Sequence, residues 1–588
     1  MAAQKPCTLA LNEVENRMAD EVVGTWIKTA ERARTLTILP PGVDAATWAK
    51  LVVQFRAILG DDGILTSHEH RVRYTDPYAE HQDETEQEKR GSAATLFPVT
   101  VEHIQGVLKI CNEHRIPTWT VSRGKNLGYG GPAARVKGSI ILDLQRMNKV
   151  IEVNDRYSYY TVEPGVTFFD IYRAIKEQNK KVWCSVPALG WGSVVGNALD
   201  RGWGYTPAGD HSNHICGMEV VLADGTLVRT GMGALNDSVC WPLFRGGYGP
   251  TYDSMFSQSN FGVVTKLSIW ASPSPEGFMI CRLDVEKEDD LTPMIDTFRG
   301  LLLNDTIQNH PVIGNVPREL AKKGMRSKFY DGKDAIPDAK MEELRKELGV
   351  GYWSARFGLY GPKEMIDFNY KRCQKAFEKL VGARLSGKAF YPPDGRDHLN
   401  PEDLPAEYRT VETGTPSLMA LKSVQYRGED GGHVSFSPIL PPEGKDAMDF
   451  YYAAKKCCSE YGFDYFGGLH LYPRHLAMIN MIYFDRQSET ERQNANKLFV
   501  DLVHLARKHG YSEYRAHIDW MDLVAEQYDF NGQSLMRLNE RIKDAVDPNG
   551  ILSPGKQGIW PERYRNGTEK PAANGTNGIQ NGVKEMTI

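Results

Sequence analysis

The chain has 588 residues, a hydrophobic fraction of 41%, a charged fraction of 25% and a formal net charge of −5 at pH 7. These values are typical of a globular protein, and the length predicts two or more units that each bury a core. The lack of a basic surplus argues against nucleic acid as the main partner, and no run of eighteen apolar residues predicts a membrane span.

The ends of the chain and its cysteines bear on location. Residues 1–21 lack the basic and then apolar order of a secretory signal. The nine cysteines have no framework spacing, which indicates free thiols in a reducing compartment. Residues 565–588 are rich in Asn, Gly and Thr and predict a disordered tail. We expect a protein of the cytoplasm or of peroxisomes that is not secreted, although the final residues MTI are not the SKL signal.

Residues 1–45 predict an N-terminal arm with one helix, and an α/β pattern extends from 46 to 276. Residues 98–114 begin with a threonine before apolar residues at helical spacing, which predicts a capped helix. An Asp-Gly pair between two apolar runs in 217–230 predicts a β-hairpin. A second helix is expected at 167–177, and further strands at 117–122, 138–144 and 159–164.

The string PSPEG at 273–277 interrupts this pattern, and the elements beyond it change. Residues 277–510 predict an α+β unit with an antiparallel sheet and helices on one face. Residues 511–564 are again rich in motifs, and we expect them to return to the first domain. The strands of the second unit are expected at 279–285, 353–359 and 477–484, and its helices at 363–381, 446–461 and 489–509.

Two glycine-rich segments point to a large ligand. The loop SRGKNLGYGG at 122–131 follows a predicted strand, and its backbone amides form a potential nest for a pyrophosphate. It fits neither G-x-G-x-x-G nor the Walker pattern, which disfavours a nicotinamide site and a P-loop. Residues 185–211 hold six glycines among bulky apolar residues. Such a run suggests backbone laid flat against a planar ligand, and a purely structural glycine-rich loop is the alternative.

The order of these segments, followed by SQSNFGVVTKLSIW at 257–270 and DPNGILSPGK at 547–556, resembles a known flavoprotein family. It is the vanillyl-alcohol oxidase and para-cresol methylhydroxylase family, and the likeness is strongest to its fungal alcohol oxidases. The strings GYTPxGDH, GMEVVLA, RTGMGAL and FSQSN carry the resemblance, which spans 50–563. It implies an α+β, two-domain flavoprotein. A para-cresol methylhydroxylase-type FAD-binding domain of two α/β subdomains would be joined to an α+β cap domain with an antiparallel sheet.

The resemblance also implies how FAD is held. His433, in GGHVSFSPI, matches the histidine that bonds covalently to the flavin, and the alternative is a neutral core histidine at a strand end. His81, in YTDPYAEH, matches the histidine that activates it. The remaining positions that match FAD contacts are Ser122, Arg123, Gly124, Lys125, Asn126, Leu127, Gly128, Gly192, Ser193, Asn197, Gly262, Val264, Arg515 and Lys556.

Tyr514 and Arg515 match the phenol-binding pair of the family, Tyr129 matches the third member, and Tyr205 matches a pocket-lining position. A para-alkyl phenol gives up hydride most readily as its phenolate. Two tyrosine hydroxyls and a permanently charged guanidinium stabilise that phenolate and lower its pKa. Arginine also suits the flavin edge on which negative charge gathers. Without the resemblance, a Tyr-Arg pair would be an ordinary surface feature.

The sequence departs from the family at Ala188, where the alcohol oxidases carry an acid/base aspartate, and at Trp191, which replaces a small residue. His470, in GGLHLYPRH, is a candidate substitute base, and a structural role is the alternative. The histidine spacing of His470 and His475, and the string DHSNH at 210–214, lack metal-ligand geometry, so we expect no metal site.

The resulting hypothesis is FAD-dependent oxidation of para-substituted phenols. Hydride passes from the benzylic carbon to flavin N5, a quinone methide follows, and dioxygen reoxidises the flavin to give hydrogen peroxide. One alternative is a dehydrogenase with another electron acceptor. A second is a flavoprotein of secondary metabolism with redirected desaturase or isomerase chemistry, because Ala188 cannot act as an acid or base. The family also implies a homodimer or a larger homo-oligomer.

Overall fold

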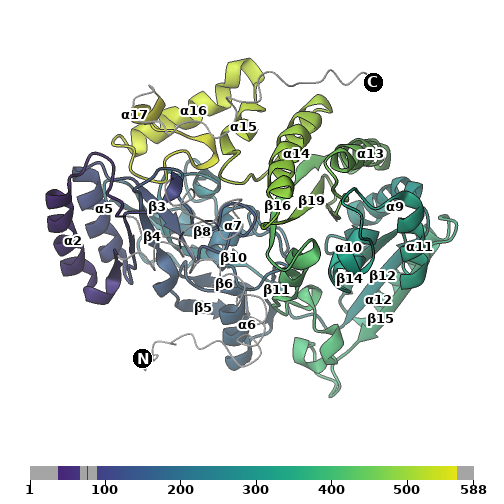
Figure 1. Ribbon diagram of the computed structural model, residues 1–588. Helices are drawn as coiled ribbons and strands as arrows, with labels where there is room; N and C mark the ends of the chain where they lie inside the picture. Colours follow the sequence, from purple (N-terminus) through teal and green to yellow (C-terminus); the bar gives the residue numbers. More distant parts are fainter. Residues whose placement is uncertain (1–36, 67–73, 75, 77–88, 566–588) are drawn as a thin grey trace.

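The structure is a computed structural model that describes residues 37–66, 74, 76 and 89–565. Nearly all of the predicted arm, including its helix, and the predicted tail from 566 onward lie outside these residues, as does His81. In Figure 1 the first half of the chain, in purple and blue, lies beside the teal and green second unit, and the yellow C-terminal helices lie above.

The first layer is a four-stranded sheet in the order β1-β2-β4-β3, in which β2, β4 and β3 run parallel. Helix α5 begins where Thr100 Oγ1 accepts a hydrogen bond of 3.2 Å from the His103 N–H, as the sequence predicts. Its apolar side chains pack on α2. The bounds are α2 Ala45–Leu59, β1 Ile64–Leu65, β2 Ala94–Leu96, α5 Val101–Glu113, β3 Thr118–Val121 and β4 Ile140–Asp143.

The second layer is an antiparallel sheet in the order β5-β6-β10-β8-β9. The hairpin predicted at 217–230 is confirmed as β8 and β9, where Val221 pairs with Leu227. Helix α6 begins with a capping box between Thr167 and Asp170. The bounds are β5 Val150–Asn154, β6 Tyr159–Val162, α6 Phe168–Glu177, β7 Val182–Trp183, α7 Val194–Leu199, β8 Ile215–Val221, β9 Leu227–Arg229, α8 Asp253–Phe256, β10 Val263–Trp270 and β11 Ser272–Pro273.

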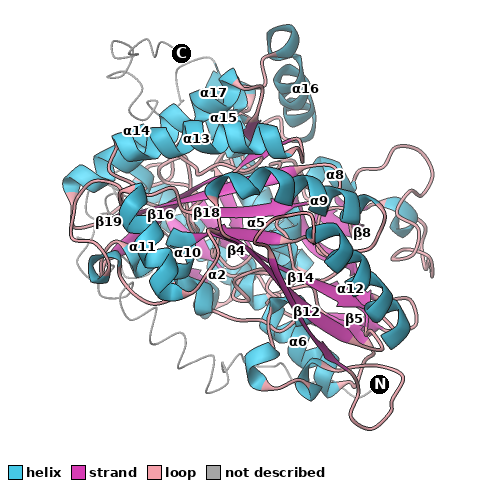
Figure 2. Cartoon of the chain, turned by 90° about the vertical axis from the view of Figure 1, so that its right-hand side faces the viewer, coloured by secondary structure: helices cyan, strands magenta, loops and turns pink. Residues whose placement is uncertain are grey.

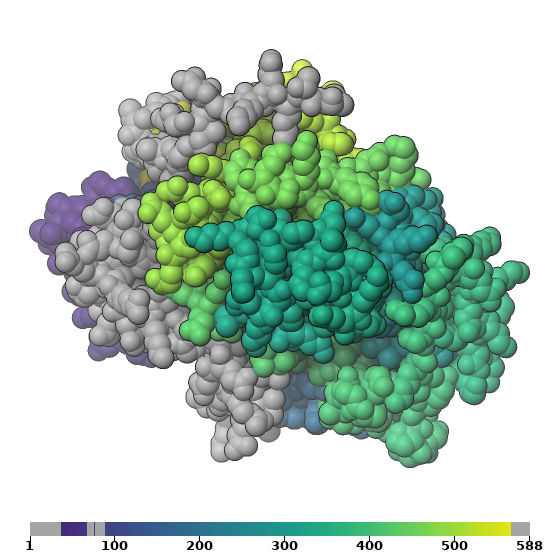
Figure 3. Space-filling view, turned by 45° about the vertical axis from the view of Figure 1, so that its right-hand side comes forward, coloured from purple at the N-terminus to yellow at the C-terminus, as the bar shows by residue number. Residues whose placement is uncertain are grey.

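The second unit is built on a nine-stranded antiparallel sheet, ordered β15-β12-β14-β13-β18-β19-β17-β20 with β16 also paired to β19. Figure 2 shows its helices against the sheet, and its residues fill the centre and right of Figure 3 in teal and green. The strands are β12 Phe278–Val285, β13 Val312–Asn315, β14 Trp353–Tyr360, β15 Arg384–Phe390, β16 Gly431–Phe436, β17 Pro438–Leu440, β18 Gly467–Leu471, β19 Leu476–Asp485 and β20 Ser512–Glu513. The helices are α9 Leu291–Leu303, α10 Val316–Ala321, α11 Asp338–Leu348, α12 Lys363–Phe377, α13 Gly444–Glu460 and α14 Glu489–Lys508.

The two faces of this sheet carry different side chains. Phe357, Leu469 and Phe436 point to the face where α9, α12, α13 and α14 bury them in the largest apolar core of the protein. Successive side chains on a strand point to opposite faces, and paired residues share a face. His433, which pairs with Tyr483, therefore points to the other face. The helix-covered face supplies stability and leaves the opposite face available for a site.

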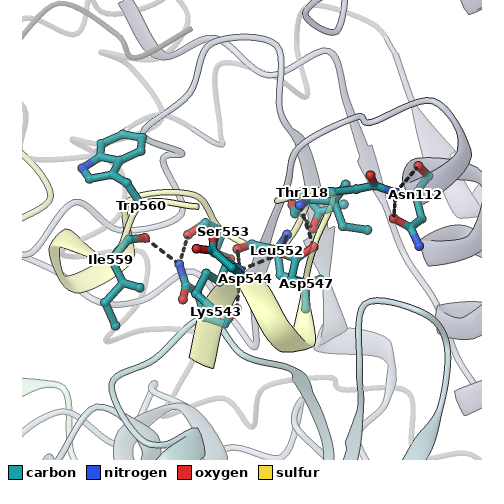
Figure 4. Close-up of polar contacts among 12 residues, drawn as sticks. Asn112, Thr118, Lys543, Asp544, Asp547, Leu552, Ser553, Ile559 and Trp560 are labelled. Carbon is teal, nitrogen blue, oxygen red and sulfur yellow. Dashed lines mark hydrogen bonds and ion pairs between the residues drawn. The ribbon is translucent and has the colours of Figure 1, made fainter. Parts of the chain in front are cut away.

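The chain returns to the first unit after β20. The Thr118 N–H donates to the Ile551 carbonyl at 2.7 Å, and the Ser553 N–H donates to the Thr118 carbonyl at 2.9 Å (Figure 4). Residues 551–553 thus extend the β3 edge of the first sheet. The last helices are α15 Met521–Glu526, α16 Phe530–Val546 and α17 Glu562–Arg565. The domain limits expected from the sequence stay a prediction, because β20 belongs to the nine-stranded sheet.

A buried ion pair fixes this returning segment. Lys543 Nζ lies 2.7 Å from Asp547 Oδ2, and neither side chain is exposed (Figure 4). The ammonium also donates to the carbonyls of Asn260 and Leu552, at 2.6 and 2.7 Å. The Asp547 carboxylate accepts from the N–H groups of Ile551 and Leu552. Every charge is therefore compensated, and removing one partner would leave the other buried alone.

The eight cysteines among the described residues are free thiols, which agrees with the expectation from the sequence for these positions. No helix within the described ranges combines the length and the apolar character needed to cross a bilayer.

We predict that Lys543→Met lowers the free energy of unfolding by about 3–5 kcal/mol, because it leaves a buried carboxylate unpaired. The matched control is Lys445→Met. It breaks an ion pair with the same i,i+4 spacing, to Asp449, in which both side chains are exposed by more than half. Such a pair contributes about 0.5 kcal/mol or less. Urea unfolding followed by tryptophan fluorescence measures both, and equal effects would contradict the prediction.

Candidate active site

The glycine loop 122–131 lies directly against β16. Gly128 has φ +78°, and a Cβ placed there would lie 2.4 Å from His433 Nε2. Gly196 of α7 makes a similar approach, since its Cβ would lie 2.4 Å from Ser122 Oγ. Gly128 is therefore required by its left-handed φ and by the His433 ring, whereas a side chain at position 196 would displace the Ser122 hydroxyl. These contacts bring together the loop, α7 and the site-bearing face of the nine-stranded sheet.

His433 is a buried, neutral imidazole at this junction. Its ring centroid lies 5.7 Å from that of Tyr483. Burial lowers its pKa to about 4, since the charged form loses its hydration; Asp76 opposes this shift and His517 adds to it. At neutral pH the ring is uncharged. One of its two nitrogens therefore keeps a lone pair, with which it can act as a nucleophile or accept a hydrogen bond.

A second histidine near this site was missed in the sequence. His517 Nε2 lies 2.7 Å from Asp76 Oδ2, and both side chains are buried. The Asp519 N–H donates to His517 Nδ1 at 3.1 Å, and Asp519 forms an ion pair with Arg90. The string HIDWMD contains this histidine and aspartate, but their pairing with residues more than 400 positions earlier has no local signal.

Tyr129, Tyr514 and Arg515, predicted as one cluster, do lie together. The Arg515 guanidinium carbon lies 4.1 Å from the Tyr129 ring centroid and 5.5 Å from that of Tyr514. Its Nη1 lies 4.0 Å from Asp200 Oδ2, which also accepts from Asn126 Nδ2 at 2.8 Å. The Arg515 side chain is only 16% exposed. It is a cation held beside two phenol rings with one distant carboxylate.

The charge of this cluster is fixed by its surroundings. Burial raises the pKa of Tyr514, and the Arg515 guanidinium only partly opposes this, so the tyrosine is a neutral donor. Burial alone would lower the pKa of Arg515. Tyr129, Tyr514 and Asp200 raise it by more than burial lowers it, so the guanidinium stays charged. Its buried Nε has no hydrogen-bond partner among the described residues. The cluster thus retains donors for an anionic oxygen.

Gln258 positions Tyr514, although the sequence analysis gave it no role. Its Nε2 donates to the Tyr514 carbonyl at 2.9 Å, and its own N–H donates to the Leu199 carbonyl at 2.7 Å. It has a left-handed φ of +47°, which a residue other than glycine adopts at a cost. On the other side, the Trp203 ring stacks on Tyr514 with centroids 4.6 Å apart.

Tyr205 and His470 lie on the cap side of the same site. His470 Nδ1 lies 3.1 Å from Nε2 of His310, a residue that the sequence analysis did not single out. The Tyr205 ring centroid lies 5.7 Å from that of His470 and 5.3 Å from that of His310. Burial lowers the pKa of His310 to about 3 and that of His470 well below 6.5. The two rings are neutral at pH 7, with one N–H shared between them.

The other positions expected to hold FAD fall into two groups. Most of the loop residues are half-buried, and a Cβ on Gly192 would meet no atom closer than 3.9 Å. In contrast, Gly262 is packed on Val220, Val264 is buried in β10, and Lys556 lies 6.0 Å from the Trp119 ring. The half-buried loop residues are Ser122, Arg123, Gly124, Lys125 and Asn126. Ser193 caps α7, and Asn197 Oδ1 lies 2.5 Å from His211 Nδ1.

This donor set fits FAD. The loop offers backbone amides with two basic side chains, Arg123 and Lys125, which suit a diphosphate. The neutral His433 ring, the unused Arg515 donor and the open space at Gly192 suit an isoalloxazine. Ala188 is half-buried on the same segment and offers no polar group. No group of three or more His, Cys, Asp or Glu side chains within the described ranges has an arrangement for a metal ion.

Comparison with known proteins agrees with this chemistry. Residues 92–231 match the FAD binding domain, and residues 417–557 match the C-terminal domain of FAD linked oxidases. The chain is 37% identical over 525 residues to the 4-cresol dehydrogenase [hydroxylating] flavoprotein subunit of Pseudomonas putida, which covers 89% of this chain and 98% of that protein. The protein is therefore an FAD-dependent oxidoreductase.

Two other relatives extend the comparison. The structure of 4-ethylphenol oxidase from Gulosibacter chungangensis superposes with a TM-score of 0.83 at 33% identity, covering 89% of this chain and 99% of that one. The 1'-carboxy-chondrochloren decarboxylase of Chondromyces crocatus is 26% identical over 499 residues, 80% of this chain and 91% of that protein. The chain belongs to the vanillyl-alcohol oxidase and para-cresol methylhydroxylase family, as predicted. These three relatives are bacterial, so the expected likeness to fungal members gains no support from them.

We predict that Gly128→Ala lowers the FAD content per chain by more than half, because the added methyl group displaces the loop from His433. The control is Gly510→Ala. Gly510 has nearly the same φ, +80° against +78°, but a Cβ there meets nothing within 4 Å. Both variants carry the strain of a left-handed alanine, about 1–2 kcal/mol. The flavin absorbance of the purified proteins separates contact from strain, and equal losses would refute the argument.

Proposed function

We propose that this FAD-dependent oxidoreductase oxidises para-substituted phenols at the benzylic carbon. The observation that carries the proposal is the buried Arg515 cation, with an unused Nε donor, beside Tyr129 and Tyr514. A phenol oxygen placed among these groups would ionise readily, since the guanidinium and two hydroxyl donors favour the phenolate. The names of two relatives, a 4-cresol dehydrogenase and a 4-ethylphenol oxidase, support the same substrate class.

The reaction follows from the phenolate. Its electron pair moves into the ring as the benzylic C–H bond breaks, and the substrate becomes a neutral quinone methide. When bound, FAD accepts the hydride at N5. Arg515 and the two tyrosines hold the substrate oxygen throughout, so they are catalytic residues in this proposal. Trp203, stacked on Tyr514, and the buried Tyr205 shield the substrate oxygen from bulk water.

The water that adds to the quinone methide then needs a proton acceptor. Ala188 provides none, whereas the neutral pair of His470 and His310 lies beside Tyr205 on the cap side. We assign His470 the role of base. It removes a proton from a water that adds to the benzylic carbon, and His310 accepts or returns the shared proton. Hydration gives an alcohol, and a second oxidation of that alcohol gives an aldehyde.

One observation favours a second outcome. With Ala188 in place of a carboxylate, loss of a side-chain proton or group from the quinone methide competes with hydration and gives an alkene. The relative named as a decarboxylase supports such redirected chemistry within the family. Product analysis by mass spectrometry separates the two, since hydration adds oxygen and desaturation does not.

The proposal includes a covalent bond between His433 and FAD. The neutral His433 ring and its contact with the glycine loop support this bond. Dioxygen reoxidises the flavin to give hydrogen peroxide. The relatives include both an oxidase and a dehydrogenase, so peroxide yield against dye reduction decides the acceptor. The protein acts as a homodimer or larger homo-oligomer, with FAD-binding residues 46–276 and 511–564 and cap residues 277–510.

We predict that Arg515→Met and Tyr514→Phe each slow anaerobic flavin bleaching by para-alkyl phenols about 10–100-fold. Each loses a hydrogen bond to a charged oxygen, worth about 1.5–3 kcal/mol. Stopped-flow absorbance measures the effect. The control Arg507→Met removes an exposed arginine paired with Asp529 and leaves the rate unchanged. Wild-type rates in both site variants would reject the phenolate cage.

We also predict that acid-precipitated wild-type protein keeps its flavin, while His433→Ala releases it. The pKa of His433, about 4 in the fold, means that the ring stays neutral as pH falls from 7 to 5. Covalent incorporation of FAD into apoprotein is therefore constant over that range, and it declines toward pH 4. Because an unfolded histidine binds its proton near pH 6.5, the apoprotein loses stability between pH 6.5 and 4. Complete release of flavin from the wild type refutes the bond.

A further inference from the structure

Arg318 occupies a slot made by two glycines on the site-bearing face of the nine-stranded sheet. Gly314 of β13 and Gly468 of β18 are direct cross-strand partners. A Cβ on Gly314 would lie 2.8 Å from Arg318 Cδ, and one on Gly468 would lie 2.8 Å from Nη1. Any other residue at either position would push the arginine away. The sheet is therefore shaped to hold this guanidinium flat against it.

The slot faces the candidate active site. His470 is two residues from Gly468 on the same strand and so points to the same face. The Arg318 charge acts on the surrounding groups: it opposes the rise that burial causes in the pKa of Tyr205 and of Tyr483, and it adds to the fall that burial causes in the pKa of His470. The guanidinium thus lies within electrostatic range of the cap side of the site.

Arg318 has no partner among the described residues. No carboxylate there lies within 4.0 Å of it, and it makes no hydrogen bond. Its two basic neighbours are both satisfied: Lys322 pairs with Glu319 at 2.5 Å, and Arg356 pairs with Glu412 at 2.7 Å. The guanidinium is half-buried and its nitrogens are not among the enclosed polar atoms, so its five donors are open to an anionic ligand.

The position of Arg318 selects the kind of anion. Helix α10, which carries it, contributes Val316 and Leu320 to an apolar cluster against which Leu189 and Trp191, near Ala188 in the chain, also pack. The Trp203 ring contacts both Tyr514, next to Arg515, and His470, which shares a sheet face with the Arg318 slot. A phenol with its oxygen at Arg515 and its benzylic carbon at His470 would extend its para substituent along the face that carries Arg318. A planar, forked guanidinium suits a carboxylate with two parallel hydrogen bonds.

We propose that Arg318 binds a carboxylate at the end of the para substituent, so that the substrates are 4-hydroxyphenyl alkanoic or alkenoic acids. This inference rests on the proposed phenol oxidation, which sets the position of the phenol ring. It adds that the far end of the para substituent carries a negative charge. Arg318 then makes the enzyme prefer phenols with a carboxylate on the para substituent over phenols with an uncharged substituent.

The test compares 3-(4-hydroxyphenyl)propanoate with its uncharged amide, which has nearly the same shape. Anaerobic flavin bleaching by the holoenzyme gives the reduction rate divided by the dissociation constant for each. We expect the wild type to favour the acid at least tenfold. Arg318→Gln lowers the ratio of reduction rate to dissociation constant about 10–100-fold for the acid and less than threefold for the amide. The loss is confined to the acid because a hydrogen bond to a charged group changes a binding constant about 10–100-fold.

Two variants serve as controls for this comparison. Lys322→Gln removes a neighbouring cation that is already paired, and it keeps the preference for the acid. Arg318→Lys keeps a positive charge in the slot and retains part of the preference even if Arg318→Gln folds poorly. Equal losses for acid and amide in Arg318→Gln, or a wild type without preference, overturn the proposal.

A second readout separates this inference from the proposed function. 3-Phenylpropanoate has the carboxylate but no phenol group, so it binds without reacting. Calorimetric titration of the holoenzyme should show weaker binding by about tenfold or more in Arg318→Gln. If no phenol bleaches the flavin but this difference remains, phenol oxidation fails and the carboxylate site stands. If phenols bleach the flavin and the difference is absent, the carboxylate site fails alone.

Discussion

Gly128 and His433 meet with no space for a side chain between them, and this contact joins the two halves of the site. The glycine loop brings Tyr129 toward Arg515, while β16 belongs to the sheet that carries His470 and the Arg318 slot. Each half rests on an apolar core of its own: one on the core of the β5-β6-β10-β8-β9 sheet, the other on the helix-covered core of the nine-stranded sheet. A fixed contact between them sets the position of the phenolate cage relative to the cap, and neither half holds a complete site alone.

Burial sets the charge of three histidines in this site. The imidazoles of His433, His310 and His470 are kept neutral because the interior disfavours their charged forms. The guanidiniums of Arg515 and Arg318 cannot lose their charge in this way. The site therefore combines neutral nitrogen bases with two permanent cations, which suits the proposed substrate, anionic at both ends and less so once hydride has left.

Local patterns in the sequence predicted the elements well, because caps and periodicity act over a few residues. The helix predicted at 98–114 and the hairpin at 217–230 are examples. The family resemblance predicted Tyr129, Tyr514 and Arg515, which do come together. It missed Gln258, His310, His517 and Arg318. Each acts through a partner from 160 to 441 positions away or through a slot between two strands, and single polar residues carry no pattern that reveals such contacts.

The hydrogen bond between Thr118 and the Ile551 carbonyl closes a gap of 433 residues, and this has a consequence for biosynthesis. Strand β3 keeps an unpaired edge until residue 551 has been made. At about 5–20 residues per second, a ribosome needs roughly 20–90 s to synthesise that interval. All strands of the intervening nine-stranded sheet are made within this time, whereas the first unit still exposes an edge that can pair with another nascent chain. The order of completion on the ribosome thus reverses the order of the sequence, and the flavin cradle is finished last.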